Sequence, residues 1–294
     1  MTAFRVASAA VCLMLVCISA TAQTSRSQHD GWRSDALSFR AADAVQLSGS
    51  LITPRAGPAI AVVVLVHGSG PAERYTALAA LMALRRIAVL TYDKRGVGES
   101  GGGYEGVDDV SAANLELLAA DAAAAMKWVA ESPAVRSLPR GFVGLSQAGW
   151  IVPLAMSESP TVAFIGFWSG PTCTTSEQLH FQRFSAEHDS DRPQGASDKI
   201  SEAMRRVEYR ADDVDPLTRL KAVSLPGLWL FGGQDPYVPI DVSTKRLQEL
   251  IDMGRSNFQY RVFPDEGHNL ADSPKQESFV AMVDWIEQIA LSSR

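Results

Sequence analysis

The chain has few cysteines, no excess of basic charge and no internal repeats. It contains three cysteines in 294 residues and carries a formal net charge of −6. An acidic chain gives no reason to expect nucleic acid or an acidic membrane surface as a partner. The absence of repeats and of low-complexity tracts excludes a repeat array. What the chain does have is apolar residues, 46% of the total, enough for one sizeable core or at most two domains.

The first residues have the features of an export signal. Arg5 precedes an apolar stretch over residues 6–18, and an A-x-A motif follows at 20–22. This order is typical of a secretory signal peptide over residues 1–22 that is cut before Gln23. The apolar stretch is short for a membrane span, so an uncleaved anchor is the less favoured alternative. We therefore expect an exported protein, periplasmic or secreted, with no stable membrane insertion after cleavage.

A single cysteine, Cys173, remains once the signal is removed. One cysteine cannot form an intrachain disulfide, and a fold of this size does not need one. Because Cys173 follows an apolar, strand-like run, we interpret it as a buried small hydrophobic residue and not as a nucleophile.

The hydrophobic pattern alternates between strand-like and helix-like segments. A continuous β-branched run opens the segment 60–70, as is typical of a strand buried on both faces of a parallel sheet. The further strands that the pattern predicts lie at 87–93, 140–146, 161–170, 227–233 and 258–263, and the helices at 75–86, 111–132, 147–157, 240–253 and 275–291. Strands separated by helices predict right-handed crossovers and a doubly wound, mostly parallel α/β sheet.

Two regions depart from this alternation. Residues 23–36 are predicted to be a polar, flexible leader, which places the folded domain at 37–294 and begins it with a hairpin at the sheet edge. At about 172–224, apolar residues at helical spacing flank a polar stretch that contains Gly and Pro. We expect a small helical lid here, and a surface excursion without regular structure is the alternative. Its two apolar patches are Leu179/Phe181/Phe184 and Ile200/Met204/Val207.

Ser146 lies between a strand-like run and a helix-like segment in the sequence GFVGLSQAGW. A serine on a sharp strand-to-helix turn needs small residues two positions before and after it, which here are Gly144 and Ala148. The start of the helix adds N–H groups near the negative charge that develops during acyl transfer. Because Ala148 stands where G-x-S-x-G has its second glycine, a strand-end serine without function is the alternative.

Acyl transfer by serine needs a histidine base and a carboxylate that orients this histidine. Asp235 ends the segment GLWLFGGQD, and His268 follows a strand and a glycine in VFPDEGHNL. Asp241 is the poorer candidate, because an acidic residue in the first turn of a helix has a simple dipole explanation. The carboxyl ends of parallel strands meet at one edge of the sheet. The order Ser146, Asp235, His268 therefore predicts a catalytic triad.

The segment HGSGP at 67–71 places flexible backbone after the first central strand. We predict that the Ser69 N–H pairs with the Gln147 N–H to form an oxyanion hole. His67 is better interpreted as a residue that shapes this loop than as a base. A phosphate-binding loop is disfavoured, since neither phosphate-loop glycine motif follows the strand.

With these residues in place, the sequence resembles the α/β-hydrolase superfamily, whose triad follows the same chain order. The resemblance covers about 37–291 and rests on HGSGP, YDKRGVGESGG, VGLSQAG, LFGGQDPYVP and EGHNL. The segment DKRGVGES is similar to that of lid-bearing bacterial carboxylesterases and their peptidase-like relatives. In such proteins it is mainly structural. We therefore interpret Asp93 and Arg95 as an ion pair beside a glycine turn, outside the catalytic set.

The resemblance implies a carboxylesterase that cleaves small esters through an acyl-enzyme on Ser146. It requires no metal and no organic cofactor, and it makes no prediction of an oligomeric state. Trp150 and Trp168 are candidates for the walls of an acyl pocket, as are Phe181 and Phe184 of the lid. The alternatives are a peptidase or amidase, an acyltransferase with the same triad, and a non-catalytic binding protein on this fold.

Overall fold

The computed structural model describes residues 26–29, 31–104, 106, 110–159, 162–187, 202–255 and 257–292. The predicted signal peptide over 1–22 and the centre of the expected lid over 188–201 lie outside the described residues. Within them, no helix has the length and the apolar character that crossing a membrane requires.

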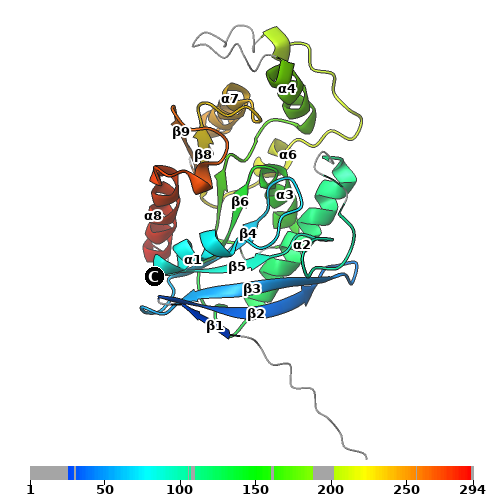
Figure 1. Ribbon diagram of the computed structural model, residues 1–294. Helices are drawn as coiled ribbons and strands as arrows, with labels where there is room; N and C mark the ends of the chain where they lie inside the picture. Colours follow the sequence, from blue (N-terminus) through cyan, green and yellow to red (C-terminus); the bar gives the residue numbers. More distant parts are fainter. Residues whose placement is uncertain are drawn as a thin grey trace, which may run out of the picture.

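A mostly parallel β-sheet forms the centre of the fold (Figure 1). Its strands are β1 (Arg26–His29), β2 (Trp32–Arg40), β3 (Gln46–Pro54), β4 (Ala61–Val66), β5 (Ile87–Tyr92), β6 (Arg140–Leu145), β7 (Phe164–Trp168), β8 (Gly227–Gly232) and β9 (Phe258–Phe263). Over the described residues it has nine strands in the order β1-β2-β3-β5-β4-β6-β7-β8-β9. β1, β2, β3 and β5 pair antiparallel, and every pairing from β5 to β9 is parallel.

Helices cover both faces of this sheet (Figure 1). They are α1 (Thr76–Leu84), α2 (Ala112–Glu131), α3 (Ala148–Ala155), α4 (Thr175–Glu187), α6 (Leu217–Leu220), α7 (Ile240–Asp252) and α8 (Glu277–Ser292), with 3₁₀ turns η1 (Met156–Glu158) and η3 (Leu270–Asp272). Side chains of α1 and α8 pack in one apolar core, and those of α2, α3, α6 and α7 pack in a second one. Every residue of β4 and β5 is buried between these cores. The predicted doubly wound α/β architecture is confirmed.

The expected flexible leader over 23–36 is wrong from Arg26 onward, because two edge strands occupy this region. β1 pairs with the start of β2, and β2 pairs with β3 along its length, from Trp32 opposite Pro54 to Arg40 opposite Gln46. An antiparallel edge exposes one face to solvent, so its strands are polar at alternate positions. The polar composition of this segment therefore fits an edge strand as well as a leader.

The expected lid contains one long helix among its described residues. α4 includes the first predicted apolar patch. Of the second patch, Ile200 lies outside the described residues. Residues 202–204 are helical, but residues 205–210 are not, so no continuous helix covers Met204 and Val207.

Asp93 and Arg95 do not pair with each other, which corrects the interpretation of DKRGVGES. Asp93 Oδ2 accepts from Arg74 Nη2 at 2.6 Å, and Arg95 Nη2 donates to Asp121 Oδ1 at 2.6 Å. Arg95 Nη1 also reaches Asp43 Oδ2 at 2.7 Å. The two charges thus tie the loop after β5 to different parts of the fold.

Candidate active site

Ser146 occupies a strained turn between β6 and α3. Its φ is +48°, in the left-handed region that side chains other than glycine rarely adopt. The turn is held by its backbone: the Ser146 N–H donates to Trp168 O at 2.9 Å, and the Gly149 N–H donates to Ser146 O at 2.8 Å. Strain of this kind persists where the surrounding structure fixes it, and it is common at functional sites.

Close packing around this turn explains its small residues. A Cβ added to Gly144 would lie 2.5 Å from the Cβ of Ala148. A Cβ added to Gly149 would lie 2.5 Å from Pro171 O. The alanine that departs from G-x-S-x-G is therefore accommodated because Gly144, facing it, has no side chain.

Replacing Gly144 by alanine is expected to destabilise the protein, because the new methyl group overlaps that of Ala148. Overpacking of this kind costs about 1–3 kcal/mol. The change should cost less in an Ala148→Gly background, where a milder contact with Phe167 Cδ1 at 3.3 Å remains. Thermal unfolding of the wild type, both single variants and the double variant measures this coupling. Equal losses in the two backgrounds would show that the two methyl groups do not compete for space.

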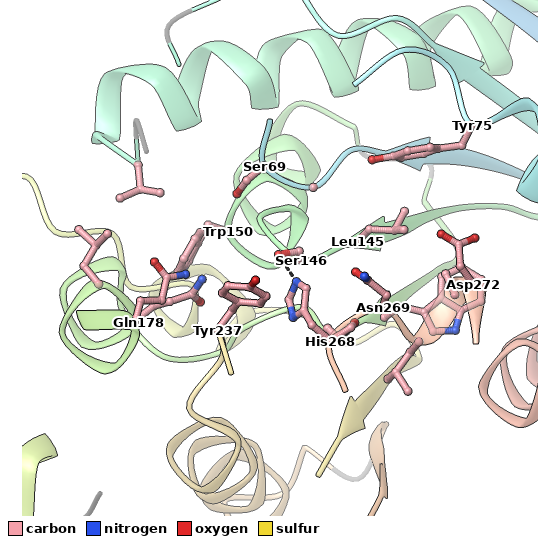
Figure 2. Close-up of a pocket in the computed structure, with 18 residues that line it drawn as sticks. Ser69, Tyr75, Leu145, Ser146, Trp150, Gln178, Tyr237, His268, Asn269 and Asp272 are labelled. Carbon is pink, nitrogen blue, oxygen red and sulfur yellow. Dashed lines mark hydrogen bonds between the residues drawn. The ribbon is translucent and has the colours of Figure 1, made fainter. Parts of the chain in front are cut away.

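The structure brings Ser146, His268 and Asp235 into one hydrogen-bonded chain. His268 Nε2 lies 2.9 Å from Ser146 Oγ (Figure 2), and His268 Nδ1 lies 2.7 Å from Asp235 Oδ2. Asp235 is 4% exposed, and its Oδ1 accepts the N–H groups of Tyr237 at 2.8 Å and Val238 at 3.0 Å. One carboxylate oxygen therefore serves the loop, and the other is left for the histidine.

The loop that carries His268 lies directly against the end of β8, where Asp235 follows. A Cβ on Gly232 would meet Gly267 O at 2.0 Å, so only glycine permits this close approach. The loop is held from a second side by Ser169 Oγ, which donates to His268 O at 2.7 Å. The aromatic ring of Tyr237 meets the imidazole edge to face, with 5.1 Å between centroids. These contacts fix the histidine between its two partners.

The loop after β4 places a second backbone N–H donor, that of Ser69, near Ser146, in addition to the N–H of Gln147. A Cβ on Gly68 would lie 3.3 Å from the Cβ of Ser146, so this loop packs directly on the nucleophile turn. Within the described residues, neither the Ser69 N–H nor the Gln147 N–H donates to an acceptor of the protein. Both donors are thus available to a bound oxyanion, as an oxyanion hole requires.

His67 packs behind this loop. Its Nε2 donates to Tyr92 O, 2.5 Å away, and its ring meets that of Tyr92 edge to face. Burial lowers the pKa of His67 to about 3, so the imidazole is neutral and acts as a donor at this contact. The residue supports the loop and does not line the cavity.

Ser146 and His268 open into a cavity of about 410 Å³, within the usual range for a small-molecule site. Trp150, Gln178 and Tyr237 line it on one side of the Ser146–His268 pair, and Tyr75, Leu145, Asn269 and Asp272 line it on the other (Figure 2). Trp150 and Trp168, which the sequence suggested as pocket walls, both line it and are each 1% exposed.

The face of α4 that lines the cavity differs from the expected one. Gln178, Leu179 and Gln182 line it, whereas Phe181 and Phe184 are absent from its lining. The helix starts with reciprocal bonds: the Thr174 N–H donates to Glu177 Oε2 at 2.7 Å, and the Glu177 N–H donates to Thr174 Oγ1 at 3.2 Å. This cap sets the rotation of α4 over the site.

A residue near the end of the expected lid also holds the N-terminus of α4. Thr175 Oγ1 and the Ser176 N–H each donate to Asp213 Oδ1 at 2.7 Å. Arg246 of α7 forms ion pairs with both Glu177 and Asp215. These bonds therefore fix the first turn of α4 and, with it, the position of the residues that line the cavity. Cys173 beside it is fully buried, as expected, and burial raises the pKa of its thiol.

The sequence did not single out several residues that line the cavity. Tyr75 starts the loop-to-helix segment after β4, and Tyr237 follows Asp235 by two positions. Asp272 follows His268 by four positions and lies in η3. Proximity to a triad residue in the chain was the one available signal, and it applies to Tyr237 and Asp272 but not to Tyr75.

Comparison with known proteins gives one family match. Residues 57–188 match the family model described as serine aminopeptidase, S33. The matched part contains the loop with Ser69 and the turn with Ser146 and Gln147, and it ends before Asp235 and His268. A curated relative, acylamino-acid-releasing enzyme 2 of Oryza sativa subsp. japonica, is 22% identical over 237 residues. That alignment covers 77% of this chain, but the chain spans only 30% of the length of the relative.

Solved structures share the fold over most of the chain. An esterase of Pyrococcus furiosus superimposes with a TM-score of 0.64 at 17% identity, covering 87% of this chain and 91% of its own. A cold-adapted esterase from an Arctic intertidal metagenomic library gives 0.58 at 16% identity, covering 90% and 96%. An acylaminoacyl peptidase of Pyrococcus horikoshii gives 0.61 at 18% identity, covering 87% of this chain and 42% of its own. These structures show that the chain has the α/β-hydrolase fold, and its residues 57–188 are similar to the serine aminopeptidase family.

Proposed function

We propose that the protein is a serine hydrolase that cleaves small carboxylic esters through an acyl-enzyme on Ser146. The observation that carries this proposal is the chain of hydrogen bonds from Asp235 through His268 to Ser146, which opens into a cavity of about 410 Å³. The family match over residues 57–188 supports a serine hydrolase, and the esterases among the structural neighbours support the ester class.

In the acylation step, His268 Nε2 takes the proton of Ser146 Oγ as the oxygen attacks the ester carbonyl. The carbonyl oxygen becomes an oxyanion, which the N–H groups of Ser69 and Gln147 receive. Asp235 keeps the Nδ1 proton directed at itself and stabilises the imidazolium. Protonated His268 then gives its proton to the leaving alcohol, and the acyl group remains on Ser146.

Deacylation repeats these roles with water as the nucleophile. His268 takes a proton from the water as it attacks the acyl-enzyme, the same two N–H groups hold the second oxyanion, and Ser146 leaves with the proton returned by His268. Leu145, Trp150 and Leu179 supply apolar walls beside Ser146, which suit a short acyl chain.

We expect the purified protein to hydrolyse p-nitrophenyl esters, fastest with short acyl groups, because the cavity has a limited volume and apolar walls. A series from acetate to dodecanoate, measured as kcat/KM, tests this. No turnover of any ester above the rate in buffer would contradict the proposed function. Rates that rise steadily to the longest chain would contradict the preference for small acyl groups.

One observation favours a second candidate, a peptidase for substrates with a free amino end. Asp272 is the one carboxylate among the described residues that line the cavity, and a carboxylate there suits a substrate ammonium group. Aminoacyl p-nitroanilides, assayed beside the esters, separate the two functions. An Asp272→Asn variant that raises KM for the anilides alone would favour the peptidase, and anilides that are not cleaved would exclude it.

A further inference from the structure

Lys94 is a buried cation behind the candidate active site, only 4% exposed. Its Nζ donates to three oxygens: Gly68 O at 2.6 Å, Gly70 O at 3.1 Å and Gln147 Oε1 at 3.3 Å. An ammonium group has three protons, so these contacts use its full donor capacity. In the described part of the chain, no carboxylate lies within ion-pair distance of it, and neighbouring Asp93 is paired with Arg74.

A buried charge without a counter-ion is unfavourable, and the fold would lose less by placing an apolar side chain here. Burial accordingly lowers the pKa of Lys94 to about 8. The titratable groups beside Lys94 have other partners. Arg95 pairs with Asp121 and Asp43, and neutral His67 donates to Tyr92 O. Lys94 therefore has no ion-pair role, and its three acceptors indicate what it does.

The first acceptor controls the direction of one oxyanion donor. Gly68 C=O and Ser69 N–H belong to the same peptide unit, which is trans, so they point in opposite directions. A bond from Lys94 to Gly68 O thus directs the Ser69 N–H away from the lysine. Because Gly68 packs on the Cβ of Ser146, this direction leads toward the nucleophile.

The other acceptors complete the arrangement. Gly70 O fixes the far end of the same loop, and Gln147 carries the second oxyanion donor on its backbone. One ammonium group therefore ties together the two segments that supply the N–H groups. A charge-assisted bond to a carbonyl also polarises its amide, which strengthens the Ser69 N–H as a donor.

We propose that Lys94 is a positioning residue that aligns and polarises the oxyanion hole. It does not touch the substrate. Its effect reaches the reacting carbonyl through the Gly68–Ser69 peptide and through Gln147. The proposal rests on the proposed function, since it requires a tetrahedral oxyanion on Ser146.

The test is a Lys94→Met variant, which keeps the length of the side chain and removes the charge and the donors. We expect kcat for a short ester to fall about 10- to 100-fold near neutral pH, somewhat less than the loss of a direct oxyanion donor. KM should change by less than about threefold. A trifluoromethyl ketone, which forms an oxyanion adduct with a serine nucleophile, should bind more weakly by the same factor as kcat/KM. A Lys221→Met variant, at an exposed position, is the matched control.

The pH profile gives a readout that a merely structural role would not move. The ammonium form of Lys94 is present below a pKa of about 8 and is lost as the pH rises through it. The kcat of the wild type should therefore decline above pH of about 8, and Lys94→Met should lack this decline. Tyr104 lines a small cavity together with Lys94, so a Tyr104→Phe variant that keeps the decline assigns it to the lysine.

Two results would overturn the proposal: unchanged ketone binding in Lys94→Met, or a loss confined to KM. If the methionine variant fails to fold, Lys94→Gln decides, because its amide retains donors without the charge and should give an intermediate loss of ketone binding. A wild type that binds the ketone through Ser146 but hydrolyses no ester would contradict the ester function alone. The comparison of ketone binding would then still decide the role of Lys94.

Discussion

Replacing Ser146 by alanine is expected to abolish ester hydrolysis, with a loss in kcat of about 10⁶-fold, as for other serine nucleophiles. The reason is that no other hydroxyl lies at 2.9 Å from His268 Nε2 in the described structure. Activity that remains would come from the oxyanion donors and from substrate binding alone.

The Ser146→Ala variant should keep its fold. The bond from the Ser146 N–H to Trp168 O is made by the backbone, and alanine has the same Cβ on the same left-handed turn. The thermal midpoint should therefore change little, which separates loss of chemistry from loss of structure. A Ser157→Ala variant, at an exposed serine, is the matched control.

Initial rates on a short p-nitrophenyl ester measure this loss, and intact mass after treatment with a fluorophosphonate shows whether Ser146 is the reactive group. The wild type and the Ser157→Ala variant should gain one phosphonyl group, and Ser146→Ala should gain none. If Ser146→Ala retained more than about a hundredth of the rate of the wild type, Ser146 would not be the nucleophile. Absent labelling of the wild type would favour a non-catalytic binding protein.

The sequence predicted the sheet and the meeting of Ser146, Asp235 and His268 for one physical reason. Buried parallel strands form continuous apolar runs, and their carboxyl ends lie at one edge, so polar residues that follow these runs come together. Predicting that these residues meet does not require the rotation of each side chain to be known. This is why three residues separated by up to 122 positions were found without any knowledge of the packing.

The features that were missed depend on contacts between distant segments. β2 is polar because it lies at a sheet edge, which composition alone does not distinguish from a leader. Which face of α4 lines the cavity is set by the Thr174–Glu177 cap and by the bonds from the first turn of the helix to Asp213. The hydrophobic pattern does not reveal these bonds, and it favoured Phe181, whereas Gln178 lines the cavity. Lys94 lies in a segment interpreted as structural, and its three acceptors come from two other loops.

Replacing Asp235 by asparagine is expected to lower kcat by about 10⁴-fold while leaving the fold intact. Asp235 Oδ1 accepts two backbone N–H groups, from Tyr237 and Val238. In the variant, the amide oxygen must occupy that position, because an NH₂ group there would face two donors. The NH₂ group therefore points at His268.

An NH₂ group is a donor, so His268 Nδ1 would have to accept from it. The proton of a neutral imidazole would then reside on Nε2, the atom that lies 2.9 Å from Ser146 Oγ. A protonated Nε2 cannot take the proton of the serine. The variant would thus hold its histidine in the right place but in the wrong tautomer, and kcat should fall far more than KM changes.

Two further variants separate the tautomer from other effects. Asp235→Ala should lose activity and also about 1–3 kcal/mol of stability, because it leaves the Tyr237 and Val238 N–H groups without their acceptor. Asp241→Asn, in the first turn of α7, should leave kcat unchanged and cost at most about 1 kcal/mol. Steady-state kinetics and thermal unfolding of the three variants test these expectations.

If Asp235→Asn kept its rate within tenfold of the wild type, a second carboxylate would have to orient His268. None lies within hydrogen-bond distance of its ring among the described residues.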